Sequence, residues 1–558
     1  MTPGIRRQSF HAFNETRANL LARRIEEIFL DLLIIFHILS NKNNSSMPFL
    51  SMGKETYPVP LELFATNRRK LVDRMQKKNG LIYLEGGPSE TRFDSDHEPL
   101  FRQESYVWYL TGVKEPDVRV IIDSASAETT LLIPRLPPEY ATIMGTIRTC
   151  EEWKALYQVD RVLYSDETED FLQSTLTSMT NGHGLPKIFL MKGVNSDSGN
   201  AFLTPKLPDS VASYADTDTL YSILAECRVL KSPSELHLLQ HVTEVTSFAH
   251  AYVMRNYQPG HMEYQGESLF RHYCYYNYGC RLVGYTPICG CGPNAAILHY
   301  GHSGEPNARQ SVDGDMALFD MGAEYHGYGS DVTCSFPVNG KFTDKQKGIY
   351  QAVLNAQVKV YDMLRPGVSY LDCHKASEAA ILEQLIAIGI VTPGNKSVEE
   401  LVEMRLGAVF MPHGLGHFIG IDTHDVGGYL PGHPERILQP GLKSLRTARI
   451  MQENMTLTVE PGCYFIDHLL DEALSGEFKE FINADVVAEY RGFGGVRLED
   501  VVQITADGMV NYTLCPRTIE EVESVMAGGK WPPLTDTAPQ LRRARLTEPN
   551  PLPAPPSL

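Results

Sequence analysis

Three features that would point to common protein classes are missing from this sequence. Its ten cysteines include no C-x-x-C pair, so a thioredoxin-like or zinc-ribbon site has no support. It has no basic excess: 50 Lys and Arg oppose 68 Asp and Glu, and a net charge of −18 argues against nucleic-acid binding and a polybasic membrane anchor. Its apolar run from Ile28 to Leu39 is shorter than the about 20 residues that span a bilayer, and it makes a poor signal peptide.

What remains is an ordinary globular composition, with 43% hydrophobic and 21% charged residues in a chain of 558. That length is too great for one core and favours more than one folded domain. Scattered cysteines without a convincing secretion signal are typical of free thiols in a reducing compartment, so we expect a cytoplasmic protein. The acidic excess leaves one function open, because clustered carboxylates bind divalent metal ions.

Composition divides the chain into four parts. Residues 1–51 read as an N-terminal extension that is disordered or partly helical; a targeting segment, a membrane tether and an artefact of gene modelling are the alternatives. Residues 52–225 mix strand-like and helical stretches and predict an α/β domain. Residues 226–530 predict a larger α+β domain. Residues 531–558 are rich in proline, and we expect them to be disordered.

Local signals fix several elements in the two domains. Residues 81–84, 118–122 and 129–133 read as strands. Ser232-Pro233-Ser234-Glu235 is a capping box with proline at the first helical position, so a helix is expected to begin there. Thr343, with Gln346 three residues later, predicts a second capped helix, which should end before Arg365-Pro366-Gly367.

Two strand-like runs in the larger domain each contain an aspartate. Residues 315–322 and 329–336 flank the turn-like segment 324–327. A hairpin centred between residues 325 and 326 would place Asp320 directly opposite Asp331, on one face of the sheet. Two opposed carboxylates repel unless a proton or a cation lies between them. The alternative is that one or both point to solvent.

Further acids and imidazoles lie at sharp backbone features. His413 and His417 belong to a Gly-containing segment that cannot be a regular helix and should be a loop; two structural histidines are the alternative. Glu460 ends an apolar strand before a Pro-Gly turn, and period-2 alternation puts Arg497 and Glu499 on one strand face. Four carboxylates with at least one imidazole suit hard or borderline ions, Mn²⁺ first, with Zn²⁺ or Co²⁺ as alternatives. Two ions sharing bridging carboxylates would balance this much negative charge.

The sequence resembles the pita-bread metallopeptidases, and among them the Xaa-Pro dipeptidase (prolidase) branch, from about residue 52 to 529. The resemblance implies a creatinase-like α/β N-terminal domain followed by a pita-bread catalytic domain, in an α+β fold, and a homodimer. It rests on an ordered series of motifs: Leu318-Phe319-Asp320, Asp331, His413-Gly414-Leu415-Gly416-His417, Thr458-Val459-Glu460-Pro461-Gly462 and Arg497-Leu498-Glu499-Asp500.

The resemblance also implies a role for each motif. Asp320 would chelate one of two metal ions, Asp331 and Glu499 would bridge both, and His417 and Glu460 would complete the second. A metal-bridging hydroxide would attack the imide carbonyl of an Xaa-Pro dipeptide, and Glu460 would handle its proton. Arg446 looks like the clamp for the dipeptide's free carboxylate, which a guanidinium holds bidentately. The other implied substrate contacts or stabilisers of the tetrahedral intermediate are His299, His413, His424, Tyr285 and Arg497.

Two other functions compete with this hypothesis. An aminopeptidase P, which acts on longer Xaa-Pro peptides, would share all five metal ligands; Arg446 favours the dipeptidase, because a charge clamp on the second residue penalises longer peptides. A non-catalytic pita-bread protein would serve as a binding module, but such relatives lose ligands, and here all five are present.

Overall fold

The computed structural model describes residues 48–76, 78–180, 185–533 and 535–546. The chain divides into two compact units, residues 1–49 and 50–558, and nearly all described residues belong to the second. The predicted N-terminal extension lies outside the described residues up to position 47. Its last residues depart from the prediction, because Phe49–Leu50 forms strand β1 and the Leu50 side chain is buried.

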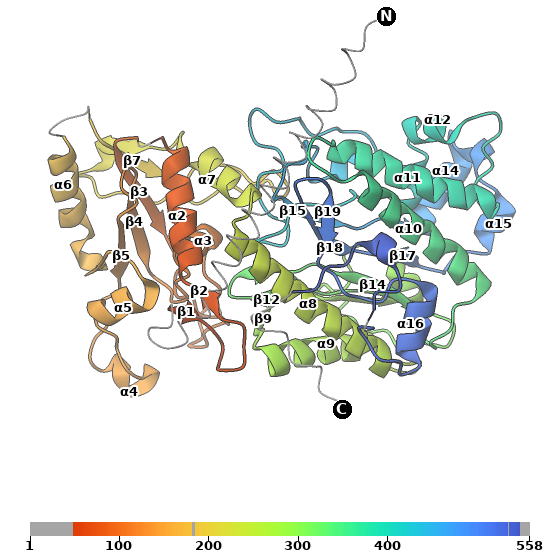
Figure 1. Cartoon of the computed structure of the whole chain (residues 1–558), viewed down its shortest axis with the longest axis horizontal. Coiled ribbons are helices and arrows are strands. Elements are labelled where there is room, and N and C mark those ends of the chain that lie inside the picture. The colour runs from red at the N-terminus through yellow and green to blue at the C-terminus, as the bar shows by residue number, and fades with distance from the viewer. Residues whose placement is uncertain (1–47, 77, 181–184, 534, 547–558) are drawn as a thin grey trace, which may run out of the picture. The chain divides into compact units, whose positions relative to one another are not determined.

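The N-terminal part of the second unit is built on one mixed six-stranded sheet, in the order β6-β5-β4-β3-β7-β8 (Figure 1). The three predicted strands are confirmed as β3, β4 and β5. The strands of this part are β2 (Val59–Pro60), β3 (Gly80–Glu85), β4 (Arg119–Asp123), β5 (Thr129–Ile133), β6 (Arg161–Tyr164), β7 (Lys187–Leu190) and β8 (Ala215–Asp216). Its helices are α2 (Glu62–Arg74), α3 (Ser105–Thr111), α4 (Tyr140–Met144), α5 (Cys150–Tyr157), α6 (Thr168–Met179) and α7 (Leu220–Val229).

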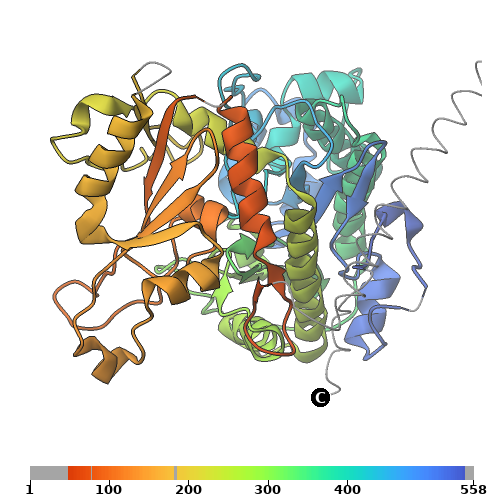
Figure 2. The same ribbon diagram turned by 60° about the vertical axis from the view of Figure 1, so that its left-hand side comes forward.

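Both faces of this sheet are apolar and covered, which is why its strands are apolar at nearly every position. Ile82 and Leu84 share a hydrophobic cluster with Phe64 of α2. Leu81 and Tyr83, which alternate with them, belong to a second cluster with Leu172 of α6. Figures 1 and 2 both show α2 (red) lying beside the sheet.

The larger part of the chain begins with the two predicted capped helices and their neighbours. The capping boxes are confirmed: the Ser232 N–H donates to Glu235 Oε2 at 2.8 Å, and the Thr343 N–H donates to Gln346 Oε1 at 2.8 Å. The helices are α8 (Pro233–Asn256), α9 (Glu263–Tyr278), α10 (Asp344–Met363), α11 (Tyr370–Ala387), α12 (Val398–Glu403), α13 (Gly407–Phe410), α14 (Asp467–Ser475), α15 (Ala484–Ala488) and α16 (Ile519–Met526).

Four small antiparallel sheets lie among these helices, in the orders β10-β11-β14, β13-β12-β9, β15-β18-β19 and β16-β17. Most of their buried apolar side chains belong to the same hydrophobic cluster as α2 and α8, while Leu318 and Tyr464 belong to a separate small cluster. Their strands are β9 (Leu282–Val283), β10 (Ile288–Cys291), β11 (Met316–Asp320), β12 (Ala323–Tyr325), β13 (Tyr328–Gly329), β14 (Thr333–Pro337), β15 (Thr456–Val459), β16 (Gly462–Tyr464), β17 (Gly495–Arg497), β18 (Asp500–Ile504) and β19 (Met509–Asn511).

The hairpin predicted around residues 324–327 exists, but its predicted register is wrong. Asp320 pairs with Thr333, two residues beyond the expected Asp331. The turn is centred on His326 and Gly327, both with positive φ (45° and 85°), as a two-residue hairpin turn requires. A shift of two residues leaves the strand faces unchanged, so the two aspartates still share a face.

The C-terminal segment also departs from the prediction of disorder, as far as it is described. Trp531, Ala538 and Leu541 are buried, and the Arg543 guanidinium donates to Glu521 Oε1 at 2.7 Å. The backbone of Arg543 forms a parallel bridge with Asn511 at the end of β19. Buried apolar side chains and two ion pairs, Arg543–Glu521 and Arg542–Asp362, therefore hold this Pro-rich segment on the folded unit. Residues 547–558 lie outside the described part.

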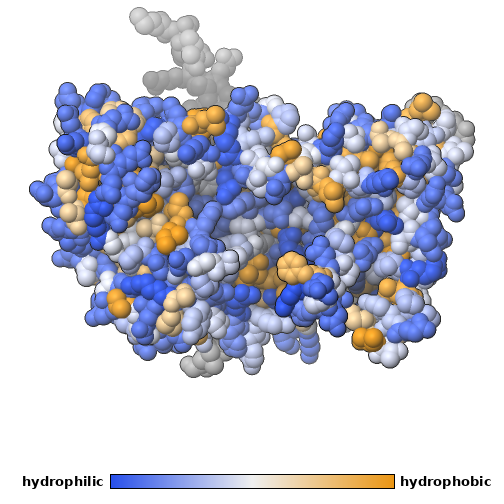
Figure 3. All heavy atoms as spheres, turned by 180° about the vertical axis from the view of Figure 1, so that it is seen from behind, coloured by the Kyte–Doolittle hydropathy of each residue, from blue (hydrophilic) through white to orange (hydrophobic). Residues whose placement is uncertain are grey.

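The surface shown in Figure 3 is mostly hydrophilic, with hydrophobic residues in scattered groups. Within the described residues, none of the helices combines the length and the apolar character that a membrane crossing needs.

Candidate metal centre

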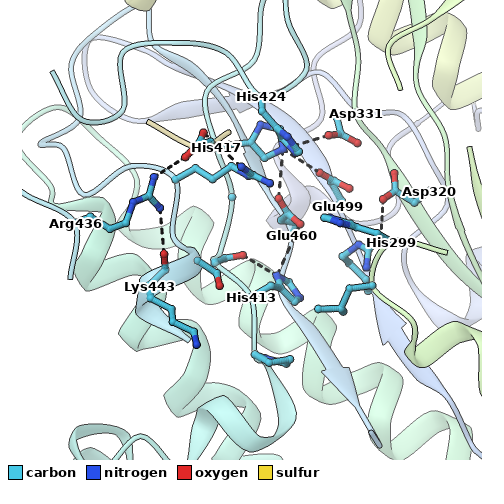
Figure 4. A pocket seen from close by; sticks show the side chains of 18 residues that line it. His299, Asp320, Asp331, His413, His417, His424, Arg436, Lys443, Glu460 and Glu499 are labelled. Atoms are coloured by element: carbon cyan, nitrogen blue, oxygen red, sulfur yellow. Dashed lines mark hydrogen bonds and ion pairs between the residues drawn. The ribbon is translucent and has the colours of Figure 1, made fainter. Parts of the chain in front are cut away.

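One pocket of about 470 Å³ collects most of the predicted site residues (Figure 4). Tyr285 is the exception: it is absent from the pocket lining, and its hydroxyl donates to Asp320 Oδ1. The predicted residues that line the pocket are His299, Asp320, Asp331, His413, His417, His424, Arg446, Glu460, Arg497 and Glu499.

Three of the acids lie at or next to strand ends that border this pocket. Asp320 is the last residue of β11, Glu460 follows β15, and Glu499 precedes β18. In the β15–β18 ladder Val459 pairs with Asp500, so Glu460 and Glu499 leave adjacent ends of two paired strands. Apolar strands thus anchor each carboxylate on a rigid element while its side chain points into the cavity.

The histidines come from an irregular loop, as predicted, and glycine is required in it. A Cβ at Gly414 would lie 2.5 Å from Leu445 Cα, and one at Gly416 would lie 2.3 Å from the Thr458 carbonyl oxygen. This close approach to β15 lets the His417 N–H donate to Thr458 Oγ1 at 3.1 Å. The loop backbone therefore fixes the position of the His417 ring relative to the acids.

Three sets of side chains converge closely enough to share an ion. In each set, one ligand atom per residue lies within 4.8 Å of the others. All five residues predicted as metal ligands belong to these sets, together with His424, which the resemblance had assigned to substrate. The sets are Asp320–Asp331–Glu499, His417–Glu460–Glu499 and Asp331–His417–His424.

The packing of carboxyl groups perturbs their protonation. Burial and then the neighbouring Asp331 raise the pKa of Asp320 to about 6. Burial raises the pKa of Glu460 to about 7, and burial together with Asp331 and Glu460 raises the pKa of Glu499 well above its usual value. Three of the four carboxyls thus favour their protonated form, because burial and mutual repulsion disfavour the charged form.

His417 and Asp331 are arranged differently from the other groups. The His417 Nδ1–H donates to the Phe418 carbonyl oxygen at 2.9 Å, which turns Nε2 toward the acids, 3.2 Å from Asp331 Oδ2 and 3.4 Å from Glu460 Oε1. Burial opposes ionisation of Asp331, but the hydrogen bond with His417 lowers its pKa. Among the described residues no donor reaches the other oxygen, Asp331 Oδ1, although it is buried.

A hydrogen-bonded network that the sequence did not reveal borders the acids. Arg497 donates to Asp320 Oδ2 at 2.6 Å, to Thr333 Oγ1 at 3.0 Å and to the Tyr464 hydroxyl at 2.9 Å. Tyr464 Oη lies 3.0 Å from His413 Nε2. Burial, followed by the charge of Arg497, lowers the pKa of His413 to about 3, so its ring is neutral. Tyr464 follows a Pro-Gly turn, and no local pattern marks it as part of the site.

The far side of the pocket from Asp320 is basic. Figure 4 shows Arg436 and Lys443 at that side, and His299 close to Asp320. Arg446 lies within electrostatic reach of His299 and His424, because its charge contributes, after burial, to the lowered pKa of both imidazoles. A ligand with an acidic end thus has a defined orientation: its anion toward the arginines and its opposite end toward the carboxylates.

Two family models match the chain. Residues 237–506 match metallopeptidase family M24, and residues 64–183 match the aminopeptidase P N-terminal domain. The Xaa-Pro dipeptidases of Homo sapiens and Rattus norvegicus are each 47% identical to this chain over 489 residues, which cover 86% of it and 96% of each relative. A probable Xaa-Pro aminopeptidase of Talaromyces marneffei is 33% identical over 470 residues, 82% of this chain and 96% of that relative.

Solved structures with this architecture carry related names. A zinc-substituted Escherichia coli aminopeptidase P in complex with product has a TM-score of 0.66 and 27% identity, and the match covers 85% of this chain and 99% of that one. The Pseudomonas aeruginosa aminopeptidase PepP has a TM-score of 0.67 and 26% identity, with 85% and 99% of the two chains covered.

Proposed function

This chain belongs to metallopeptidase family M24, and we propose that it hydrolyses Xaa-Pro dipeptides with two divalent metal ions held by Asp320, Asp331, His417, Glu460 and Glu499. It is a metal-dependent Xaa-Pro hydrolase, as its similarity to Xaa-Pro dipeptidases over 86% of its length indicates. Its α+β fold joins a creatinase-like N-terminal domain to a pita-bread domain. The proposed domain bounds are 52–225 and 226–530.

The observation that carries the proposal is a buried cluster of acids that is short of positive charge. Asp331 Oδ1 is buried without a donor among the described residues, and the pKa values of Asp320 and Glu460 are raised to about 6 and 7, chiefly by burial. A divalent cation would give Asp331 Oδ1 a partner and would stabilise the ionised forms of Asp320 and Glu460. One imidazole nitrogen among carboxylate oxygens suits Mn²⁺, which we propose as the native ion, ahead of Zn²⁺ or Co²⁺.

The protein's own groups would bind and orient the dipeptide and move its proton. The ions, when bound, polarise the scissile carbonyl and activate a water at neutral pH. Glu460, which lines the pocket with its Oε1 3.4 Å from His417 Nε2, would take a proton from the attacking water on its carboxylate and return it to the leaving imino nitrogen. Arg446 holds the free carboxylate, and His299 and His424 flank the peptide between the two ends.

Arg497 and His413 would position neighbouring groups: Arg497 holds Asp320, and both residues hydrogen-bond to Tyr464. Arg497 fixes Asp320 Oδ2, which leaves Asp320 Oδ1 to Tyr285 and to an ion. The His413 Nδ1–H donates to the Gly414 carbonyl oxygen at 2.8 Å, so the neutral ring accepts the Tyr464 hydroxyl at Nε2. Both nitrogens of His413 are engaged, and its contribution in this arrangement is to position Tyr464 and Arg497.

The substrate explains why such a site is needed. An Xaa-Pro bond is a tertiary amide without an N–H, so a peptidase that relies on this donor cannot grip it. Recognition must instead come from the two charged ends of the dipeptide and from shape. Arg446 and the acids proposed as metal ligands line the same pocket, so the guanidinium would hold the free carboxylate while the amino end of the dipeptide faces the acids.

Hydrolysis of Gly-Pro during titration of the metal-free protein with Mn²⁺, Zn²⁺ or Co²⁺ tests this function. We expect activity to rise with added ion and to level off at two ions per chain, measured by elemental analysis. Gly-Ala and Pro-Gly serve as controls, which should be cleaved far more slowly. Binding of less than one ion per chain, or cleavage of an Xaa-Pro tripeptide as fast as Gly-Pro, would overturn the dipeptidase assignment; the latter result would favour an aminopeptidase P.

We also propose a homodimer. Large apolar side chains are exposed on the N-terminal part: Phe93 (94% exposed), Ile143 (85%) and Met144 (54%). Helix α4, which carries the last two, has no buried residue. Contiguous exposed apolar surface marks contact sites, and Ile143 and Met144 are adjacent on α4. Light scattering on protein eluted from a size-exclusion column should give the mass of two chains. A mass of one chain at micromolar concentration would contradict the homodimer.

A cytoplasmic location is proposed on the chemistry of the cysteines. All ten lie in the described residues and none forms a disulfide. Nine of them are buried, as expected for thiols that serve packing in a reducing compartment. Fractionation of cells should recover the protein with cytoplasmic markers; recovery in a secreted or membrane fraction would contradict the proposal.

A further inference from the structure

The basic end of the pocket, where the arginines lie, also contains an acid from the N-terminal part of the chain. Asp197 lies between β7 and β8, in a small hairpin closed by a bridge between Val194 and Ala201. The Asn195 side-chain oxygen accepts the N–H groups of Asp197 and Ser198, at 2.9 and 3.0 Å. The hairpin therefore presents Asp197 from a backbone that its own side chains hold in place, and only 12% of the Asp197 side chain is exposed.

Asp197 joins two guanidinium groups. Its Oδ1 lies 2.5 Å from Arg436 Nη2, and its Oδ2 lies 3.5 Å from Arg446 Nη1. Arg446 is the residue proposed to clamp the free carboxylate of the dipeptide. One carboxylate thus contacts both the clamp and Arg436.

Arg436 ties this arrangement to the backbone of the clamp. It donates to the Leu445 carbonyl oxygen at 2.8 Å and to the Ser196 carbonyl oxygen at 3.1 Å. Its guanidinium lies over the Tyr429 ring at 4.3 Å, and the Tyr429 hydroxyl also donates to Leu445 at 2.7 Å. Arg436 therefore holds both Leu445, which precedes Arg446, and Ser196, which precedes Asp197.

The charges at this end leave room for one more carboxylate. The two arginines carry two positive charges and Asp197 one negative charge, so a single positive charge is uncompensated. The Lys443 ammonium also lines the pocket, but it points away from Arg436 (Figure 4), and neither ion pair of Asp197 involves it. A dipeptide supplies one carboxylate at this position. A tripeptide would supply a neutral amide there and would carry its own carboxylate one residue further, at an end of the pocket that already contains Asp197.

We propose that Asp197 is a specificity-determining residue, which restricts the pocket to dipeptides by holding Arg446 and by repelling the carboxylate of any longer peptide. This inference rests on the proposed dipeptidase function and deepens it. Selectivity would then come from weaker binding of the longer peptide, which meets both a steric block and a like charge at Asp197. Asp197 does not touch the reacting atoms, so its effect should appear in substrate binding.

The test compares Gly-Pro with Gly-Pro-Gly in the metal-loaded full chain, for the wild type, Asp197→Asn and Asp197→Ala. We expect the tripeptide-to-dipeptide ratio of kcat/KM to rise in Asp197→Asn, which removes the charge but keeps the volume. It should rise further in Asp197→Ala, by at least about tenfold, mainly through a lower KM for the tripeptide. The kcat for Gly-Pro should stay within about twofold of the wild type, while its KM increases.

Asp166→Asn is the matched control. Asp166 pairs with Arg135 at 2.8 Å in the same part of the chain, but both side chains are exposed and neither lines the pocket. A ratio that stays within about twofold of the wild type in both Asp197 variants overturns the inference while the dipeptidase function stands. Failure of the wild type to hydrolyse Gly-Pro overturns the proposed function itself. Asp197→Asn is isosteric, so it keeps the test valid if Asp197→Ala does not fold.

Discussion

Replacing Arg517 should destabilise the protein and weaken metal binding together. Its guanidinium is buried, with 1% of the side chain exposed. It donates to the Thr333 carbonyl oxygen at 2.8 Å, to the Glu499 carbonyl oxygen at 2.6 Å and to Asp500 Oδ1 at 2.9 Å. One side chain therefore joins β14 to Glu499, the residue that precedes β18 and is itself a proposed bridging ligand.

Arg517→Met keeps much of the volume and removes every donor. It leaves Asp500 as a buried acid, and breaking a buried ion pair in this way costs about 3–5 kcal/mol. Two carbonyl oxygens also lose a donor, at about 1 kcal/mol or more each. Tyr361 and Asn511 still donate to Asp500 Oδ2, at 2.6 Å each, and this reduces the loss. We therefore expect a net destabilisation of about 4 kcal/mol.

Thermal unfolding and metal titration of the same samples measure both effects. The melting temperature should fall by several degrees, and the affinity for Mn²⁺ should fall by about tenfold to a hundredfold, because the backbone at Glu499 loses its support. Arg161→Met is the control: its pair with Glu128, at 3.1 Å, is half-exposed and worth about 0–1 kcal/mol. If Arg517→Met melts with the control and binds metal normally, the argument from buried pairing is refuted.

Three further changes should separate the roles of other groups. Asp331→Asn should abolish Gly-Pro hydrolysis and lower the bound metal per chain while circular dichroism stays unchanged; near-normal turnover would contradict its role as a bridge. Arg446→Ala should raise the KM for Gly-Pro by about tenfold to a hundredfold with a smaller change in kcat, and the same loss for Gly-Pro-amide, which lacks the carboxylate, would count against the clamp. Burial raises the pKa of Glu244 to about 7 in the folded protein. Its contribution to stability is therefore fully present below its unfolded-state pKa of about 4.5 and is lost as the pH rises through 7. The loss is about 3 kcal/mol, and Glu244→Gln should flatten the stability–pH curve between pH 4.5 and 8; an unchanged curve would show that Glu244 does not titrate there.

Elements with local signals could be predicted from the sequence. The capped helices that begin after Ser232 and Thr343 form where expected, because their cap bonds join residues three apart. The hairpin was placed but its register was not. The turn type depends on which residues adopt positive φ, and His326 does so before Gly327. The C-terminal segment was mispredicted because composition does not show that Trp531 and Leu541 have a surface to pack on.

The site itself was assembled mainly through resemblance to a family. Acids at strand ends indicated a metal centre, but no periodicity links Asp320 with Glu499, which come from segments far apart in the chain. Asp197 and Arg436 illustrate the limit most clearly, because they meet across 239 residues and neither lies in a recognisable motif. Charge complementarity between distant loops becomes visible only when the chain is folded.

The bridge between Asn511 and Arg543 bears on when the enzyme becomes active during its synthesis. Asn511 Nδ2 donates to Asp500 Oδ2 and lies 3.2 Å from the Leu541 carbonyl oxygen, so the support of the acid cluster includes residues that are translated after every metal ligand. A nascent chain still held by the ribosome at this segment would carry all its proposed ligands but lack the last brace behind Glu499 and Asp500. Release of that segment, rather than translation of the catalytic residues, would then mark the moment at which the centre matures.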